Sequence, residues 1–215
     1  MAQANVHLQC LLGMQCADFA IIAADQTNTQ SIIVMKNDEN KLYQITDKLI
    51  MGVVGDAGDA SQFSQFVSKN LQLYKMRNKY GLEPLAAVHF TRKNLADGLR
   101  TGNPSMINML VAAYDDKSGG QLFSLDFLAS CIKVPYAVHG FGGHLSFGIL
   151  DQYHKYFLTV AEAYEVLKLC VQEVHQRLFI NLPNFQVKVV SKDGITELPT
   201  INFTSVQSSN KITRL

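Results

Sequence analysis

The sequence contains no apolar run long enough for a membrane-spanning helix. Its first ten residues, MAQANVHLQC, hold neither a basic cluster nor an apolar stretch, so we expect no secretory signal. It also lacks an excess of charge of either sign: 19 Lys and Arg stand against 18 Asp and Glu, a net charge of +1. Without a broad electrostatic field, binding to nucleic acid or to an anionic membrane is not expected.

Cysteine pairs at metal-binding or redox spacing are also missing. The four cysteines are Cys10, Cys16, Cys131 and Cys170. Their scatter favours reduced, buried thiols of an intracellular protein over a disulfide framework or a zinc site. His139 and His144 flank a glycine-rich turn, but no acidic or thiol residue accompanies them at ligand spacing, so we expect no metal site. No Lys-Ser/Thr pair follows these glycines, which excludes a phosphate-binding loop, and no cofactor is expected.

The length and composition fit one globular domain, residues 1–215, with a large apolar core. A charged fraction of 17% is slightly low for a free monomer and suggests that part of the surface contacts a partner. The tail, residues 205–215, is polar and crowded with Ser and Asn, so we expect it to fray.

Four short apolar runs rich in Ile and Val dominate the first quarter of the chain. They are Phe19–Asp25, Ser31–Met35, Lys41–Ile45 and Leu49–Gly55. Continuous apolar runs of this length predict strands in a sheet that is covered on both faces. Asp25 closes the first run and Lys41 opens the third, and unpaired burial of either charge is costly. We therefore expect both residues to find partners, and function is to be sought there.

Two helices are predicted after these strands. The first follows the turn Gly55–Asp59, continues to about Tyr80 and is expected to end at Gly81. Its predicted apolar face consists of Phe63, Phe66, Val67, Leu71 and Tyr74. The second begins at Pro84 and ends before Gly102.

Strands then return before a second pair of helices. Met106–Tyr114 and Gln121–Leu125 predict a hairpin, and Ile132–His139, interrupted by Pro135, predicts a strand near an edge. The later elements are expected to be a helix from Gly140 through Leu150, a helix opened by the capping box Thr159–Glu162, and strands at Phe185–Val190 and from Ile195. The buried stripe of the last helix is predicted to be Val160, Ala163, Leu167, Val171, Val174 and Leu178.

This order of elements predicts an α+β fold with four layers. A sheet must cover its apolar face, and helices that arrive in two pairs can cover two different faces. The economical arrangement is an αββα sandwich.

The layering, together with Asp25, Lys41 and the Val54–Asp59 turn, resembles the β-type subunits of the proteasome core particle over about Leu11 to Val190. Four stretches carry a more specific resemblance: Lys69–Asn78, Phe90–Asp97, Leu150–Tyr153 and Asn181–Phe185. They are similar to the beta type-2 subunits, which occupy the fourth position of the β ring. The resemblance implies the amino-terminal nucleophile hydrolase fold.

In active members of this family, an amino-terminal Thr hydroxyl attacks the peptide carbonyl, and its free amine is the base. A Lys–Asp pair supports the site and a glycine N–H stabilises the oxyanion. In an alignment without gaps, these supports fall on Asp25, Lys41 and Gly55. The nucleophile falls on Gln9, which has no hydroxyl.

Three further supporting positions also differ from the family pattern. The Ser of its Gly-Ser-Gly turn falls on Phe141, and the Asp and Ser near the end of the fourth helix fall on Arg177 and Ile180. The resemblance therefore implies a non-catalytic subunit that helps to assemble the ring and enclose the chamber for ubiquitin-dependent degradation. It implies α and β subunits of the stacked rings as partners, and location in the cytoplasm and nucleus.

Two other hypotheses are kept beside this one. Cys10, next to the lost position, could become an amino-terminal nucleophile after processing. Strand alternation would however turn it away from Lys41, and Gln9 precedes it where active members have Gly. Without a nucleophile, a structural ion pair is the favoured interpretation of Asp25 and Lys41. A free-standing soluble domain with another partner has little support.

Overall fold

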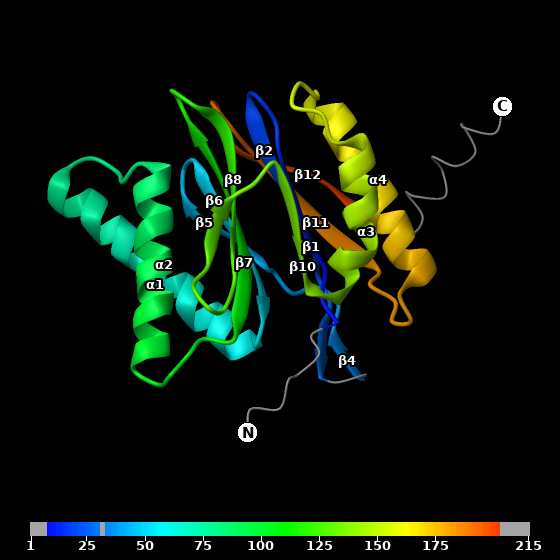
Figure 1. Cartoon of the computed structure of the whole chain (residues 1–215), viewed down its shortest axis with the longest axis horizontal. Coiled ribbons are helices and arrows are strands. Elements are labelled where there is room, and N and C mark those ends of the chain that lie inside the picture. The colour runs from blue at the N-terminus through cyan, green and yellow to red at the C-terminus, as the bar shows by residue number, and fades with distance from the viewer. Residues whose placement is uncertain (1–7, 31–32, 203–215) are drawn as a thin grey trace.

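The computed structural model describes residues 8–30 and 33–202, and Figure 1 shows them in four layers. Two antiparallel sheets pack face to face, and a pair of helices covers the outer face of each. The predicted αββα arrangement and the α+β class are confirmed. The tail 205–215 lies outside the described residues. Within the described ranges, no helix combines the length and the apolar character of a membrane span.

The first sheet has the strand order β10-β1-β2-β11-β12. Its strands are β1 (Leu11–Gln15), β2 (Phe19–Asp25), β10 (Tyr136–His139), β11 (Asn184–Ser191) and β12 (Gly194–Asn202). The helices α3 (Gly140–Tyr153) and α4 (Val160–Arg177) cover its outer face. The capping box predicted for α4 is present, since Thr159 and Glu162 bond each other's backbone N–H groups.

The second sheet has the order β5-β6-β7-β8-β9. Its strands are β5 (Leu42–Thr46), β6 (Leu49–Gly55), β7 (Ile107–Asp115), β8 (Gly119–Leu125) and β9 (Cys131–Lys133). The helices α1 (Ala57–Asn78) and α2 (Pro84–Arg100) cover its outer face.

Side chains of β1 alternate between two buried layers. Leu11 packs between the two sheets, against residues such as Ile50 of β6. Leu12 and Cys10 instead lie in the layer between the first sheet and α3/α4. Because successive side chains point to opposite faces, this register decides which residues can reach the space between the sheets.

The prediction for Ser31–Met35 was wrong in its burial. Residues 31–32 lie outside the described ranges, and β4 (Ile33–Lys36) pairs with β3 (Asn28–Gln30) in a separate two-stranded sheet. All four residues of β4 are exposed. An apolar run predicts a strand, but it does not tell whether the same chain covers it.

The segment Ile132–His139 forms two strands rather than one. β9 ends at Lys133 in the second sheet, and β10 begins at Tyr136 in the first. Pro135 lies between them, where its missing N–H costs no ladder hydrogen bond. Both strands lie at sheet edges, as predicted.

Three details of the helices also differ from the prediction. α1 ends at Asn78, whereas the prediction placed its end at Gly81. The left-handed backbone conformation that often ends a helix is adopted by Lys79 (φ 68°) instead of by Gly81. Phe66 is exposed and stacks on Phe90 of α2 instead of facing the sheet. Val160, at the first position of α4, is also exposed.

Candidate functional site

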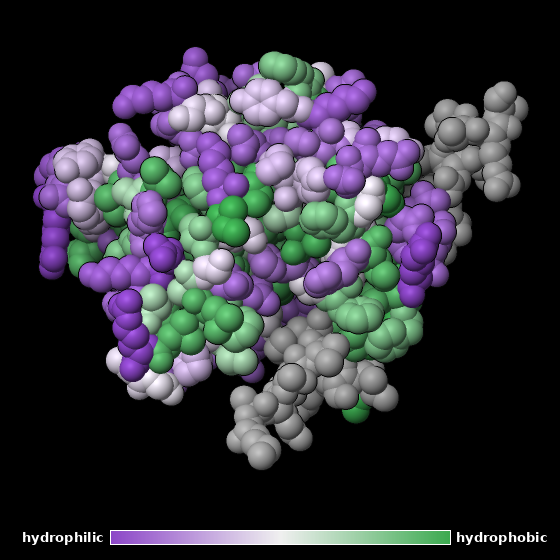
Figure 2. Space-filling view, in the orientation of Figure 1, coloured by the Kyte–Doolittle hydropathy of each residue, from purple (hydrophilic) through white to green (hydrophobic). Residues whose placement is uncertain are grey.

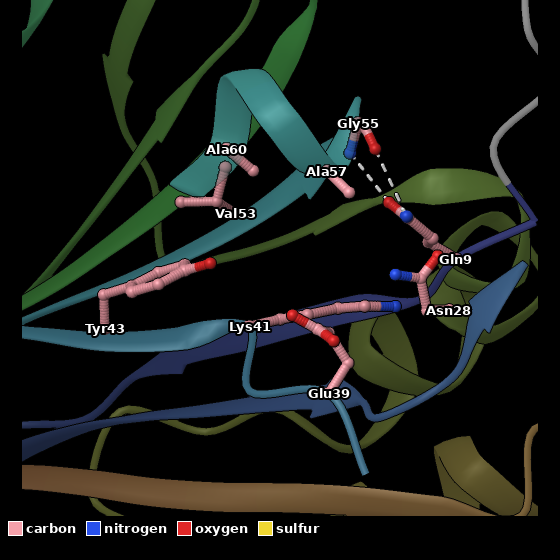
Figure 3. A pocket seen from close by; sticks show the side chains of 9 residues that line it. All are labelled: Gln9, Asn28, Glu39, Lys41, Tyr43, Val53, Gly55, Ala57 and Ala60. Atoms are coloured by element: carbon pink, nitrogen blue, oxygen red, sulfur yellow. Dashed lines mark hydrogen bonds between the residues drawn. The ribbon is translucent and has the colours of Figure 1, made fainter. Parts of the chain in front are cut away.

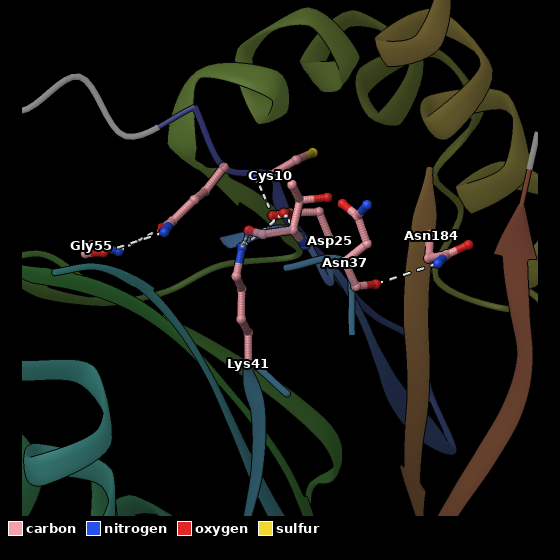
Figure 4. Close-up of polar contacts among 8 residues, drawn as sticks. Cys10, Asp25, Asn37, Lys41, Gly55 and Asn184 are labelled. Atoms are coloured by element: carbon pink, nitrogen blue, oxygen red, sulfur yellow. Dashed lines mark hydrogen bonds and ion pairs between the residues drawn. The ribbon is translucent and has the colours of Figure 1, made fainter. Parts of the chain in front are cut away.

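Four residues that the sequence singled out meet at one end of the two sheets. Asp25 is the last residue of β2 and Gly55 is the last residue of β6. Lys41 directly precedes β5, and Gln9 lies two residues before β1. Figure 4 shows Lys41 pointing toward Asp25, and Figure 3 shows Gln9 pointing toward Gly55. The site thus joins the first sheet to the second.

Asp25 and Lys41 form a buried ion pair. Lys41 Nζ lies 2.7 Å from Asp25 Oδ2 and also donates to the carbonyl of Thr27 at 2.7 Å. The Asp25 carboxylate accepts from the N–H of Cys10 at 2.7 Å and from that of Thr27 at 3.0 Å. Asp25 is 0% exposed and Lys41 6%. Each charge therefore has an opposite charge and further hydrogen bonds, which offset the cost of its burial.

Gln9 holds the backbone of Gly55 with both ends of its side-chain amide. The Gly55 N–H donates to Gln9 Oε1 at 2.7 Å, and Gln9 Nε2 donates to the Gly55 carbonyl at 3.3 Å (Figure 3). Gly55 has φ +136°, and a Cβ there would lie 2.3 Å from the carbonyl oxygen of Met106. Only glycine fits this position. Its N–H, the donor expected for an oxyanion, already has an acceptor.

A pocket opens beside these contacts and is drawn in Figure 3. Its nine lining residues are Gln9, Asn28, Glu39, Lys41, Tyr43, Val53, Gly55, Ala57 and Ala60. Among their side chains the one hydroxyl is the Tyr43 phenol, whose pKa is raised, chiefly by burial and further by Glu39. A phenol in this state is a poor nucleophile at neutral pH.

Cys10 faces away from this pocket. Its side chain is fully buried with α4 residues, and a Cβ placed on Gly142 of α3 would lie 3.3 Å from its Sγ. Figure 4 shows the sulfur on the side away from Lys41, as strand alternation predicted. Burial, and secondarily Asp25, raises the pKa of the thiol well above its usual range. A thiol in these surroundings stays protonated and is inert.

A model of one protein family, described as "Proteasome subunit", matches residues 7–190. The chain belongs to the proteasome subunit family. It is 38% identical over 187 residues to "Proteasome subunit beta type-2-A" of Arabidopsis thaliana, covering 87% of this chain and 91% of the relative. It is also 38% identical over 192 residues to "Probable proteasome subunit beta type-4" of Schizosaccharomyces pombe, covering 89% and 99%. "Proteasome subunit beta type-4" of Saccharomyces cerevisiae is 34% identical over 192 residues, which cover 89% of this chain and 97% of the relative. This chain is therefore a β-type proteasome subunit.

The other three singled-out positions of this proteasome subunit bring no polar side chain into the site. Phe141 is half exposed in the first turn of α3 and contacts the ring of Phe179. Arg177, the last residue of α4, pairs with Glu173 of the same helix. Ile180 packs against the core under α3 and α4.

The glycine-rich turn still lies beside Gln9, but it contributes only backbone. The N–H of Gly142 donates to the carbonyl of Gln9 at 3.1 Å. A Cβ on Gly140 would lie 2.2 Å from the same oxygen. The turn therefore positions the chain at Gln9 without supplying a hydroxyl.

Thr27 is a member of this site that the sequence analysis did not name. Its N–H and C=O hold the two partners of the ion pair, and its side chain is buried. The signal was its place two residues after Asp25, because Asp often accepts from the N–H two positions on. Within residues 8–30 and 33–202, no cluster of three His, Cys, Asp or Glu could hold a metal ion.

Proposed function

We propose that this chain is a non-catalytic β subunit of the proteasome core particle. It fills one place in a β ring and helps to enclose the proteolytic chamber. The observation that carries the proposal is the pair Gln9–Gly55: a carboxamide stands where active relatives have a hydroxyl, and it takes the N–H of Gly55. A carboxamide is no nucleophile, and an N–H that is already bonded is not free to stabilise an oxyanion.

The remaining parts of the site then have a structural task. The Asp25–Lys41 pair ties the end of β2 to the start of β5, and Gln9 ties the chain before β1 to the end of β6. Buried, satisfied polar contacts of this kind fix one arrangement of the two sheets. The same contacts that would align a catalytic centre here stabilise the sandwich.

The proposed partners are neighbouring β subunits, α subunits and the opposite β ring. The proposed process is ubiquitin-dependent protein degradation, and the proposed location is the cytoplasm and nucleus. Large apolar side chains on the surface support a subunit role. Ile33, Met35 and Phe157 are each more than half exposed, and Figure 2 shows several separate apolar patches on one face. Obligate interfaces cover apolar areas of this kind.

The test uses assembled particles that contain a tagged copy of the chain. Lys41→Met removes the buried cation, and Lys48→Met, in an exposed pair with Asp116, is the matched control. We expect every peptidase specificity, normalised to the amount of particle, to be the same in both variants. Loss of one specificity in fully assembled Lys41→Met particles would refute the proposal.

Cys10 carries the competing function, a peptidase with an amino-terminal cysteine. Its N–H lies 2.7 Å from Asp25 Oδ1, so a freed amine there would be held as an ammonium group rather than as a base. The intact mass of the chain from particles treated with an electrophilic peptide inhibitor separates the two functions. A chain that retains Gln9 and carries no adduct supports the structural role. A chain that begins at Cys10 and carries an adduct establishes the peptidase.

A further inference from the structure

A hollow lies at the end of the second sheet that is opposite the site described above. β7 begins at Ile107, which pairs with Gly55, and ends at Asp115, where the turn to β8 begins. The hollow lies beside this turn and the start of α2 (Figure 1). Its volume is about 760 Å³, and it is partly open to solvent. Its lining residues are Glu83, Pro84, Leu85, Asp115, Ser118, Gln121, Phe123 and Lys133.

Three neighbouring strands place an acid, an amide and a base on one face of the sheet. Residues that pair directly across an antiparallel ladder share a face, and so does every second residue along a strand. Phe123 of β8 pairs with Lys133 of β9. Gln121, two residues before Phe123, pairs with Ala113 of β7, and Asp115 follows two residues later. Because Phe123 and Ala113 lie in the core under α1 and α2, this face is the outer one.

The side chain of Gln121 is the feature that points to a ligand. It is 7% exposed and lines the hollow. Among the residues that the structure describes, its amide has no hydrogen-bond partner. A buried amide without a partner destabilises a fold, so a polar group in the hollow would find a donor and an acceptor there. The buried ring of Phe123 adds an apolar floor beside it.

Charged groups lie on both sides of this amide. The strand order β7-β8-β9 puts Asp115 on one side of Gln121 and Lys133 on the other, and Glu83, directly before α2, also lines the hollow. Within residues 8–30 and 33–202, none of these three charges forms an ion pair. Since neighbouring strands are about 4.8 Å apart, β7 and β9 are separated by about 10 Å. Two or three residues of an extended peptide, at about 3.3–3.6 Å each, span this distance.

We propose that this hollow binds a short zwitterionic peptide, two or three residues long, that carries an apolar side chain. The ammonium group lies near the carboxylates of Asp115 and Glu83, and a peptide bond exchanges hydrogen bonds with the Gln121 amide. The terminal carboxylate accepts from Lys133 Nζ, and the apolar side chain lies on Phe123. A ligand with charge of one sign would leave either the acids or the base without a partner. The inference goes beyond the proposed function and does not depend on it, because binding here needs no nucleophile.

The first test measures binding of glycyl-leucyl-glycine to the full chain by isothermal titration calorimetry. Circular dichroism checks that each variant is folded. We expect wild type to bind with a dissociation constant on the order of 1 mM or below. Gln121→Leu keeps the approximate size of the side chain without its polar atoms and should weaken binding about tenfold or more. Gln65→Leu, at an exposed position of α1, is the matched control and should change it less than about twofold. Equal affinity of Gln121→Leu and wild type, or no binding by wild type, overturns the inference.

The second test asks whether the two ends of the peptide are recognised. Lys133→Met should weaken binding of glycyl-leucyl-glycine about fivefold or more, but it should leave the affinity for the carboxyl-terminal amide of the same peptide unchanged. Lys93→Met, at an exposed position of α2, is the control and should affect neither peptide. Leucine alone cannot reach both sides of the hollow and should bind more weakly than the tripeptide. A merely structural role of Lys133 would change both peptides alike. That result, or leucine binding as tightly as the tripeptide, overturns the inference.

Discussion

The side-chain amide of Gln9 bonds both the N–H and the carbonyl of Gly55, a residue 46 positions away. The two bonds join the chain before β1, in the first sheet, to the end of β6, in the second. Sequence comparison characterises Gln9 only by the hydroxyl that it lacks. In the structure, the Gln9 side chain links the two sheets.

Gln9→Ala should therefore destabilise the sandwich locally. It removes two hydrogen bonds and leaves the buried Gly55 N–H without its acceptor, which we expect to cost about 1–3 kcal/mol of unfolding free energy. Hydrogen exchange at the Gly55 amide is the most direct measurement and should become faster. Gln65→Ala, which changes an exposed glutamine of α1, is the control and should leave that exchange unchanged. Equal protection of the Gly55 amide in both variants would contradict the role of Gln9.

Gly55→Ala should destabilise the fold more than the addition of one methyl group suggests. The new Cβ would lie 2.3 Å from Met106 O and 2.8 Å from Ile107 Cα, in a backbone conformation (φ +136°) that side chains rarely adopt. Strain and displacement of β7 together should cost about 3 kcal/mol or more, measured by urea denaturation.

Gly148→Ala is the matched control for this substitution. Gly148 lies within α3, and a Cβ there would meet nothing within 4 Å. Because Ala favours a helix over Gly, we expect a gain of up to about 1 kcal/mol. If the two variants lost similar stability, the close approach at Gly55 would not be its cause.

A double-mutant cycle should show strong coupling between Asp25 and Lys41. Lys41→Met leaves a buried carboxylate without its cation and should cost about 3–5 kcal/mol. Adding Asp25→Asn removes that charge, so the double variant should be clearly more stable than the sum of the single losses predicts. The same cycle on the exposed pair Lys48–Asp116 should show little coupling. Additive losses at Asp25 and Lys41 would mean that the two charges do not depend on each other.

Much of the fold could be predicted because the central strands are buried on both faces. β2 and β6 have the predicted bounds, Phe19–Asp25 and Leu49–Gly55, and every residue in them is buried. A continuous apolar run between polar segments leaves little freedom in where such a strand begins and ends. The capping box of α4 was equally local, since it involves only residues three positions apart.

The other features of the fold and the site could not be predicted, because they depend on contacts between residues distant in sequence or on contacts with other molecules. The apolar pattern of β4 says nothing about which molecule covers Ile33 and Met35. The passage from β9 to β10 across Pro135 depends on how the two sheets face each other. At the site, the Asp25–Lys41 pair was signalled by residue type, whereas the Gln9–Gly55 bonds had no local signal.

Acid should destabilise the protein through His139, at the end of β10. Its Nε2 shares a hydrogen bond with Ser124 Oγ of β8 at 3.0 Å, so this contact also joins the two sheets. Burial lowers the pKa of His139 to about 4, although Asp126 and a backbone hydrogen bond with Met109 act to raise it. The neighbouring His144 lowers the pKa of His139 further.

The sign of the effect follows from the two states. The unfolded histidine takes up a proton near pH 6.5, whereas the folded one does so only near pH 4. Between these values the unfolded state binds more protons than the folded state. The contribution of His139 to the free energy of unfolding is therefore constant above about pH 7, and it falls by about 3 kcal/mol in all as the pH is lowered toward 4. His139→Gln keeps a polar partner for Ser124 but cannot titrate, so its unfolding free energy should depend less on pH in this window. His89→Gln, on the exposed side of α2, should keep the wild-type slope. Because carboxylates also titrate below pH 5, the decisive quantity is the difference between the two variants, and equal slopes would exclude His139 as the source.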